Sequence, residues 1–135
     1  MNIVTGFRPS TEGRAAVDRA IEEARLRGGT VLVVHSMRGG ERDELERLMD
    51  YRERFERLKA DLEASGVPHE LIEYARGNSP AEDLLAIARD RDAALIVIGI
   101  RRRSPVGKLV LGSNAQDVLL EAECPVLAVK STPTD

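Results

Sequence analysis

The chain has 135 residues, of which 42% are hydrophobic and 32% charged, as in a soluble globular protein of one domain. Its net charge of −3 gives no general attraction to nucleic acid or anionic lipid. No apolar run approaches the roughly 20 residues that span a bilayer. The single cysteine, Cys124, fits a reducing compartment, and the first residues do not resemble a signal peptide. We therefore expect a cytoplasmic protein that binds neither nucleic acid nor a membrane.

Apolar runs alternate with helical patterns along the chain, which is typical of βαβ units in a parallel sheet. We predict an α/β fold of the open, doubly wound type, with a five-stranded parallel sheet in the order 3-2-1-4-5 and four helices in a three-layer sandwich. We expect one domain over residues 1–135. The predicted strands cover residues 2–7, 30–36, 68–74, 94–99 and 125–130, with helices between them.

Local signals mark the ends of these helices. Ser10 or Thr11 can cap the first helix, which Gly28 and the glycine after it should end. The second helix is predicted over residues 41–64. Ser79 can cap the third, because Pro80 suits the first helical position and a glutamate follows three residues after the serine.

Strands one and four should lie side by side, so the loops that follow them should share one crevice. In sheets of this type, ligands bind beyond the carboxyl ends of the strands, where the strand order reverses. The loops in question are residues 6–10 and 99–113. The second of them, predicted to be irregular from Arg101 to Leu111, leads into a helix that opens at Gly112.

Residues 99–114 have the chemistry of an anion site. Backbone N–H groups at a helix start attract negative charge, Gly112 lets a phosphate approach closely, and the Ser113 hydroxyl adds a donor. Arg101, Arg102, Arg103 and Lys108 would supply neutralising charge. On these local features alone another interpretation stays open, in which Gly112 and Ser113 simply turn and cap a helix while the arginines face solvent.

The same segment carries a recognisable glycine pattern. Gly99, Gly112 and Ser113 match a signature of glycine, two residues, glycine, nine residues, then glycine followed by serine or threonine. The apolar runs on both sides match as well, from Ala94 to Gly99 and from Cys124 to Val129. Through these motifs, essentially the whole chain resembles the universal stress protein family.

The resemblance implies a cytosolic, stress-linked homodimer, and many members of this family bind ATP. In those members the first two loops hold adenine and ribose, and the glycine signature holds the phosphates. The sequence departs from the pattern at Arg8, where nucleotide-binding members usually have aspartate, and at Arg102, in place of the second glycine. The nucleotide-binding residues predicted on this basis are Gly6, Phe7, Arg8, Ser36, Gly99, Arg101, Arg102, Gly112, Ser113 and Asn114.

Three functions remain as alternatives. The first is a stress-related regulatory protein that binds ATP, another adenine nucleotide or an anion at the loops after strands one and four. The second is a dimeric interaction module of the same family that binds no nucleotide, and the third is an enzyme that hydrolyses ATP. We predict no catalytic residue and no metal site, and we interpret His35, Tyr51 and Phe55 as packing residues. A homodimer would use the edge strand near Val126 to Val129, because an uncovered apolar edge invites pairing.

Overall fold

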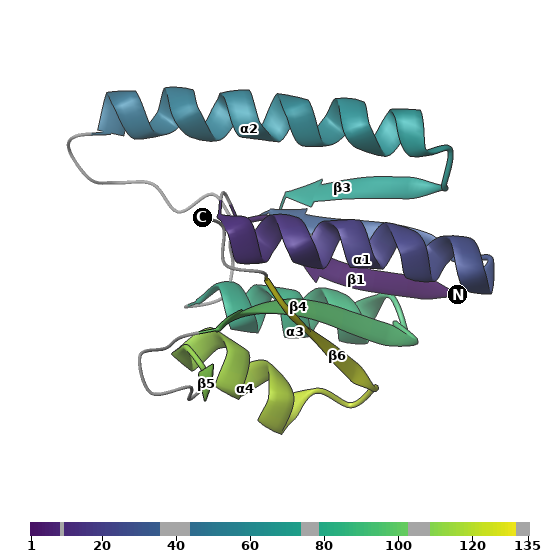
Figure 1. The fold of residues 1–135 in the computed structure, drawn as a ribbon. Helices are drawn as coiled ribbons and strands as arrows, with labels where there is room; N and C mark the ends of the chain where they lie inside the picture. The colour runs from purple at the N-terminus through teal and green to yellow at the C-terminus, as the bar shows by residue number, and fades with distance from the viewer. Residues whose placement is uncertain (9, 36–43, 74–78, 103–108, 132–135) are drawn as a thin grey trace.

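The computed structural model describes residues 1–8, 10–35, 44–73, 79–102 and 109–131, and of residues 44–48, 101, 102, 109 and 110 only the backbone. Helices and strands alternate along almost the whole of this part of the chain (Figure 1). The elements are β1 (Asn2–Gly6), α1 (Thr11–Arg27), β2 (Thr30–His35), α2 (Glu44–Ser65), β3 (His69–Glu73), α3 (Pro80–Asp90), β4 (Leu95–Arg102), β5 (Leu109–Val110), α4 (Ser113–Glu121) and β6 (Val126–Lys130).

The predicted sheet is confirmed. The parallel strands lie in the order β3-β2-β1-β4-β6, so that the fifth predicted strand is β6. β1 lies between β2 and β4, with Val4 opposite Leu32 on one side and opposite Ile96 on the other. The carboxyl ends of β1 and β4 are therefore neighbours, as the ligand-binding position of such a sheet requires.

Two helices cover each face of the sheet, because side chains along a buried parallel strand alternate between two apolar layers. On one face, Ile3 and Val97 pack among buried residues of α1 and α2. On the other face, Val4 and Ile96 pack against α3 and α4. In Figure 1 α1 lies across the front of the sheet and α2 runs above it.

The predicted helix ends agree with the structure where it describes them. Ser10 is the N-cap of α1, and its Oγ accepts a hydrogen bond from the Gly13 N–H at 3.1 Å. Gly28 ends this helix in the left-handed conformation, with φ of 68°, which glycine adopts without steric cost. Ser79 caps α3 in the same way through Glu82.

The segment after Gly99 differs from the predicted loop. β4 continues to Arg102, and Leu109–Val110 forms a short antiparallel strand, β5, that pairs with its end. The polar sequence after Gly99 does not predict that β4 continues to Arg102. This part of the strand forms through antiparallel backbone pairing with β5 and does not depend on an apolar run. Within the described residues, no helix combines the length and the apolar character needed to cross a membrane.

Candidate functional site

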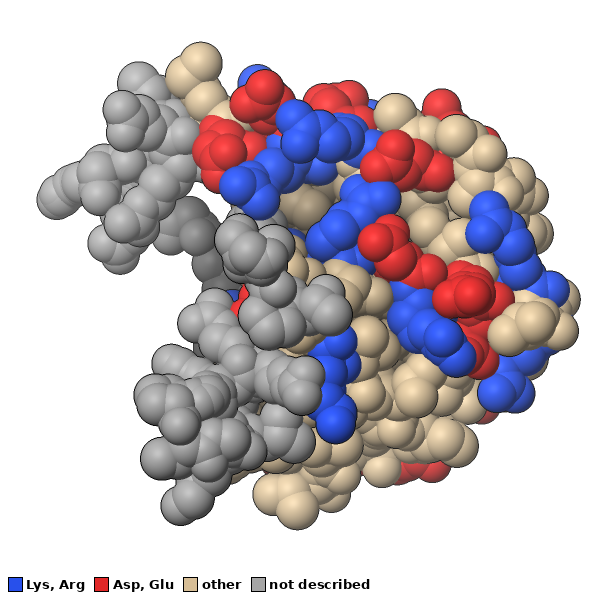
Figure 2. Space-filling view, viewed as in Figure 1, with Lys and Arg blue, Asp and Glu red and all other residues tan. Residues whose placement is uncertain are grey.

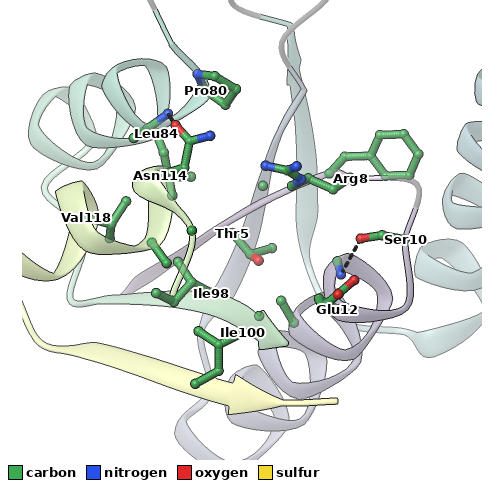
Figure 3. A pocket seen from close by; sticks show the side chains of 18 of the residues that line it. Thr5, Arg8, Ser10, Glu12, Pro80, Leu84, Ile98, Ile100, Asn114 and Val118 are labelled. Carbon is green, nitrogen blue, oxygen red and sulfur yellow. Dashed lines mark hydrogen bonds between the residues drawn. The ribbon is translucent and has the colours of Figure 1, made fainter. Parts of the chain in front are cut away.

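A cleft of about 630 Å³ opens at the carboxyl ends of β1 and β4, and its volume is within the usual range for small-molecule sites. We call it the β1–β4 cleft. Its walls come from the loop after β1 and from the first turns of α1, α3 and α4 (Figure 3). Among the described residues that line it are Thr5, Gly6, Phe7, Arg8, Glu12, Tyr51, Pro80, Leu84, Ile98, Gly99, Gly112, Ser113, Asn114 and Ala115.

Most of the predicted site residues meet in this cleft. They come from three distant parts of the chain and are Gly6, Phe7, Arg8, Gly99, Gly112, Ser113 and Asn114. Ser36 lies outside the described residues. Arg101 and Arg102 belong to β4, where their backbones pair with Val110 and Leu109, and their side chains are likewise outside the described part.

Three helices begin at the cleft, and the start of α3 already has its donors occupied. Pro80, at its first position, has no N–H group. The Ala81 N–H donates to Oδ1 of Asn114 at 3.1 Å, and the Glu82 N–H donates to Oγ of Ser79 at 3.2 Å. Figure 3 shows Asn114 reaching from α4 to this helix start. The Asn114 side chain therefore serves the fold by capping a neighbouring helix.

The start of α4 differs from the other two. Its N-cap is Gly112, which has no side chain to accept a hydrogen bond, and the N–H groups of Ser113, Asn114 and Ala115 have no acceptor among the described residues. Its first turn also carries no acidic residue, whereas the first turns of α1 and α3 carry Glu12 and Glu82 respectively. Open donors without a nearby carboxylate make this end the most favourable place for an anion in the cleft.

The two glycines of the predicted signature have different structural surroundings. A Cβ at Gly99 would collide with the backbone oxygen of Glu12, so this glycine lets the start of α1 lie directly on β4. A Cβ at Gly112 would have no heavy atom of the described residues within 4 Å, apart from those of its own chain neighbours. Gly99 is therefore required by packing, while Gly112 leaves space next to the open N–H groups.

An aromatic cluster borders the cleft on the side of β2 and α2. The Phe7 ring contacts Tyr51 edge-to-face at 5.0 Å between centroids, and His35 lies 4.4 Å from Phe55. Nδ1 of His35 is 2.6 Å from the hydroxyl of Tyr51. Burial lowers the pKa of His35, and burial together with Glu73 raises the pKa of Tyr51 to about 12. Both groups thus stay neutral near pH 7.

Tyr51 lines the cleft and Phe55 does not, so the packing interpretation holds for Phe55 and is incomplete for Tyr51. No local sequence signal distinguishes Tyr51 from the packing residues of the same helix. The chain has only two Phe and two Tyr residues, and the three of them that the structure describes, Phe7, Tyr51 and Phe55, contact one another here.

Arg8 and Glu12 are the charged residues among those that line the cleft in the described part of the chain. Arg8 extends from the loop after β1 into the cleft (Figure 3), and its side chain is exposed. The described residues contain no cluster of three or more His, Cys, Asp or Glu side chains suited to a metal ion.

A family model described as the universal stress protein family matches residues 1–130. The chain belongs to the universal stress protein family. A universal stress protein of Mycolicibacterium smegmatis is 45% identical over 134 residues, which cover 95% of this chain and 96% of the relative. The predicted family resemblance is confirmed.

Solved universal stress proteins agree with this assignment. One from Archaeoglobus fulgidus is 40% identical, with a TM-score of 0.79 over 96% of this chain and 98% of that structure. Another structure of the universal stress protein from the same organism, in complex with dAMP, is 34% identical, with a TM-score of 0.73 and the same coverage.

Proposed function

We propose that this universal stress protein binds an adenine nucleotide in the β1–β4 cleft, with the phosphate on the first turn of α4 and the nucleoside toward β1 and β2. The observation that carries the proposal is the set of open N–H groups at Ser113, Asn114 and Ala115. The related structure in complex with dAMP supports the same ligand class.

We place the phosphate at the helix start in the cleft whose positive potential is not opposed by an acidic side chain in the first turn. The N–H groups of α4, the dipole of that helix and the Arg8 guanidinium all act on one cleft. At the starts of α1 and α3, acidic side chains in the first turn oppose an anion. The hydroxyl of Ser113 can add one further donor.

We place the nucleoside against the wall of the cleft that lies opposite the start of α4. Phe7 and Tyr51 present aromatic surface there, and Val34 and Leu84 add apolar surface. An apolar slot with a few polar groups at its ends suits a planar base. Backbone groups at the ends of β1 and β2 would then supply the specific hydrogen bonds, because the side chain of Arg8 can only donate.

Calorimetric titration with adenosine, AMP, ADP and ATP tests the proposal, using the wild type and Gly112→Val. We expect AMP to bind the wild type more tightly than adenosine does. In Gly112→Val, AMP affinity should fall roughly tenfold or more, because the new side chain occupies the space of the phosphate and removes charge-assisted hydrogen bonds. Gly112→Val should melt close to the wild type, since its Cβ meets no atom of the described part of the chain within 4 Å.

Unchanged AMP affinity in Gly112→Val would place the ligand elsewhere. A wild type that binds none of these four compounds would favour the alternative of an interaction module without a nucleotide. Phosphate release measured during the ATP titration tests the remaining alternative, ATP hydrolysis.

We also propose that the chain forms a homodimer through β6. This strand pairs with β4 on one side, and no other described strand pairs with it. Val126, Leu127, Ala128 and Val129 are all partly exposed. A second copy would cover this edge, and an apolar edge without cover favours aggregation. A monomer at micromolar concentration in sedimentation equilibrium would exclude this dimer.

A further inference from the structure

A second cavity, of about 300 Å³, adjoins the nucleoside end of the β1–β4 cleft, between α1 and α2. The two cavities share Phe7, Arg8, Ser10 and Gly13, so Arg8 stands at their junction. We call the second cavity the arginine pocket. The described residues that line it are Phe7, Arg8, Ser10, Gly13, Arg14, Val17, Arg54, Arg57, Leu58 and Asp61.

Positive charge in the arginine pocket is only partly neutralised. Arg14 binds Asp61 at 2.7 Å and Asp18 at 3.0 Å, and Arg54 binds Asp50 at 3.2 Å. The guanidinium groups of Arg8 and Arg57 have no ion pair or hydrogen bond with any described residue. Figure 2 shows basic and acidic side chains interspersed over the face of the molecule to which α1 and α2 contribute.

Arg8 and Arg57 line the same cavity, so both positive charges act on the space between α1 and α2. The floor of the pocket is apolar, since Val17 and Leu58 are each 1% exposed. An apolar floor lowers the local dielectric and strengthens attraction to an anion, and the planar guanidinium fits phosphate oxygens in pairs.

From this geometry we infer that the arginine pocket binds a second phosphate group, carried on the ribose of the nucleotide in the β1–β4 cleft. The inference rests on the proposed function, which puts the nucleoside beside Phe7, and both Phe7 and Arg8 line the two cavities. The ribose hydroxyls are the positions on that end of an adenine nucleotide that can carry a phosphate. The ligand class is therefore an adenosine bisphosphate with one phosphate at the 5′ position and one at the 2′ or 3′ position.

The experiment is a calorimetric titration with AMP, adenosine 2′,5′-bisphosphate and adenosine 3′,5′-bisphosphate. The variants are Arg57→Gln and, as a matched control on the same helix, Arg52→Gln, since Arg52 is exposed and lines neither cavity. We expect one bisphosphate to bind the wild type and Arg52→Gln roughly tenfold more tightly than AMP, or better, and to lose this gain as salt rises. In Arg57→Gln the gain should shrink to about twofold or less, with AMP affinity unchanged.

If AMP binds and neither bisphosphate binds more tightly, the inference fails while the proposed function stands. A gain that survives Arg57→Gln also overturns the inference, because the second phosphate would then lie elsewhere. If neither AMP nor a bisphosphate binds, the proposed function fails and the inference fails with it. Thermal melts of both variants establish that any loss of binding occurs in a folded protein.

Discussion

The start of α4 and the start of α3 face the same cleft, yet one is open and the other is closed. The donors of α3 are occupied by Ser79 and Asn114, whereas those of α4 have no acceptor in the described structure. Nearby, the backbone of Glu12 packs directly against Gly99, whereas among the described residues no atom beyond the chain neighbours lies within 4 Å of a Cβ at Gly112. Ser79, Asn114 and Gly99 therefore build the cleft, whereas the first N–H groups of α4 are available to a ligand.

The largest effect on stability should come from Gly99→Ala. The added Cβ would collide with the backbone oxygen of Glu12, so β4 and α1 would have to separate. Overpacking of this kind costs roughly 1–3 kcal/mol, and more where backbone atoms are involved. Urea denaturation should show this loss, while Gly112→Ala, the matched control, should lose no more than about 1 kcal/mol. Equal losses in the two variants would contradict the contrast between the glycines.

Gly112→Asp should move stability and ligand binding in opposite directions. A carboxylate at the N-cap can accept from the open N–H groups of α4 and interacts favourably with the helix dipole, so stability should rise by a few tenths to about 1 kcal/mol. The same carboxylate competes with a phosphate and repels it, so AMP affinity should fall roughly tenfold or more. Urea denaturation and calorimetry on one preparation measure both changes. Tight AMP binding by Gly112→Asp would mean that the open helix start is not the phosphate site.

Asn114→Ala should remove one hydrogen-bond acceptor from the start of α3. The Ala81 N–H would lose its acceptor, and loss of a helix cap costs about 0.5–2 kcal/mol. Asn114→Asp keeps an acceptor oxygen at the same position and should retain most of the stability, which makes it the control. A stable Asn114→Ala variant would show that the contact between α4 and α3 contributes little.

The smallest effect is expected for His35 of the aromatic cluster, as a change in how the free energy of unfolding depends on pH. Burial holds the pKa of His35 below its ordinary value, so the unfolded chain binds the proton more readily than the folded chain. This contribution to stability is present above pH 6.5 or so and is lost as pH falls through the lower folded pKa. Unfolding midpoints measured across that range should fall more steeply for the wild type than for His35→Gln. Parallel curves would show that His35 is not held in its neutral form.

The sequence was sufficient for features that depend on local signals. Ser10 and Ser79 stand at helix starts because their side chains cap groups three residues away, and the apolar runs define the strands. The strand order followed from the alternation of strands and helices, since right-handed crossovers leave few topologies.

The sequence was not sufficient where a contact joins distant parts of the chain. Nothing near Gly99 shows that Glu12 packs on it, and nothing near Asn114 shows that its side chain caps Ala81. The place of Tyr51 in the cleft depends on its contacts with Phe7 and His35, which lie far away in the sequence and which periodicity does not encode. The arginine pocket likewise exists only once α1 and α2 lie side by side.

The most direct measurement is an amide nuclear magnetic resonance titration of the wild type with AMP. We expect the largest chemical-shift changes at the N–H groups of Ser113, Asn114 and Ala115, with smaller changes at Ala81 and Glu82, whose donors are already occupied. Saturable changes at the open helix start would support phosphate binding there. AMP binding with the largest changes at the start of α3 or outside the cleft, and with unchanged amide shifts in α4, would contradict phosphate binding at the start of α4.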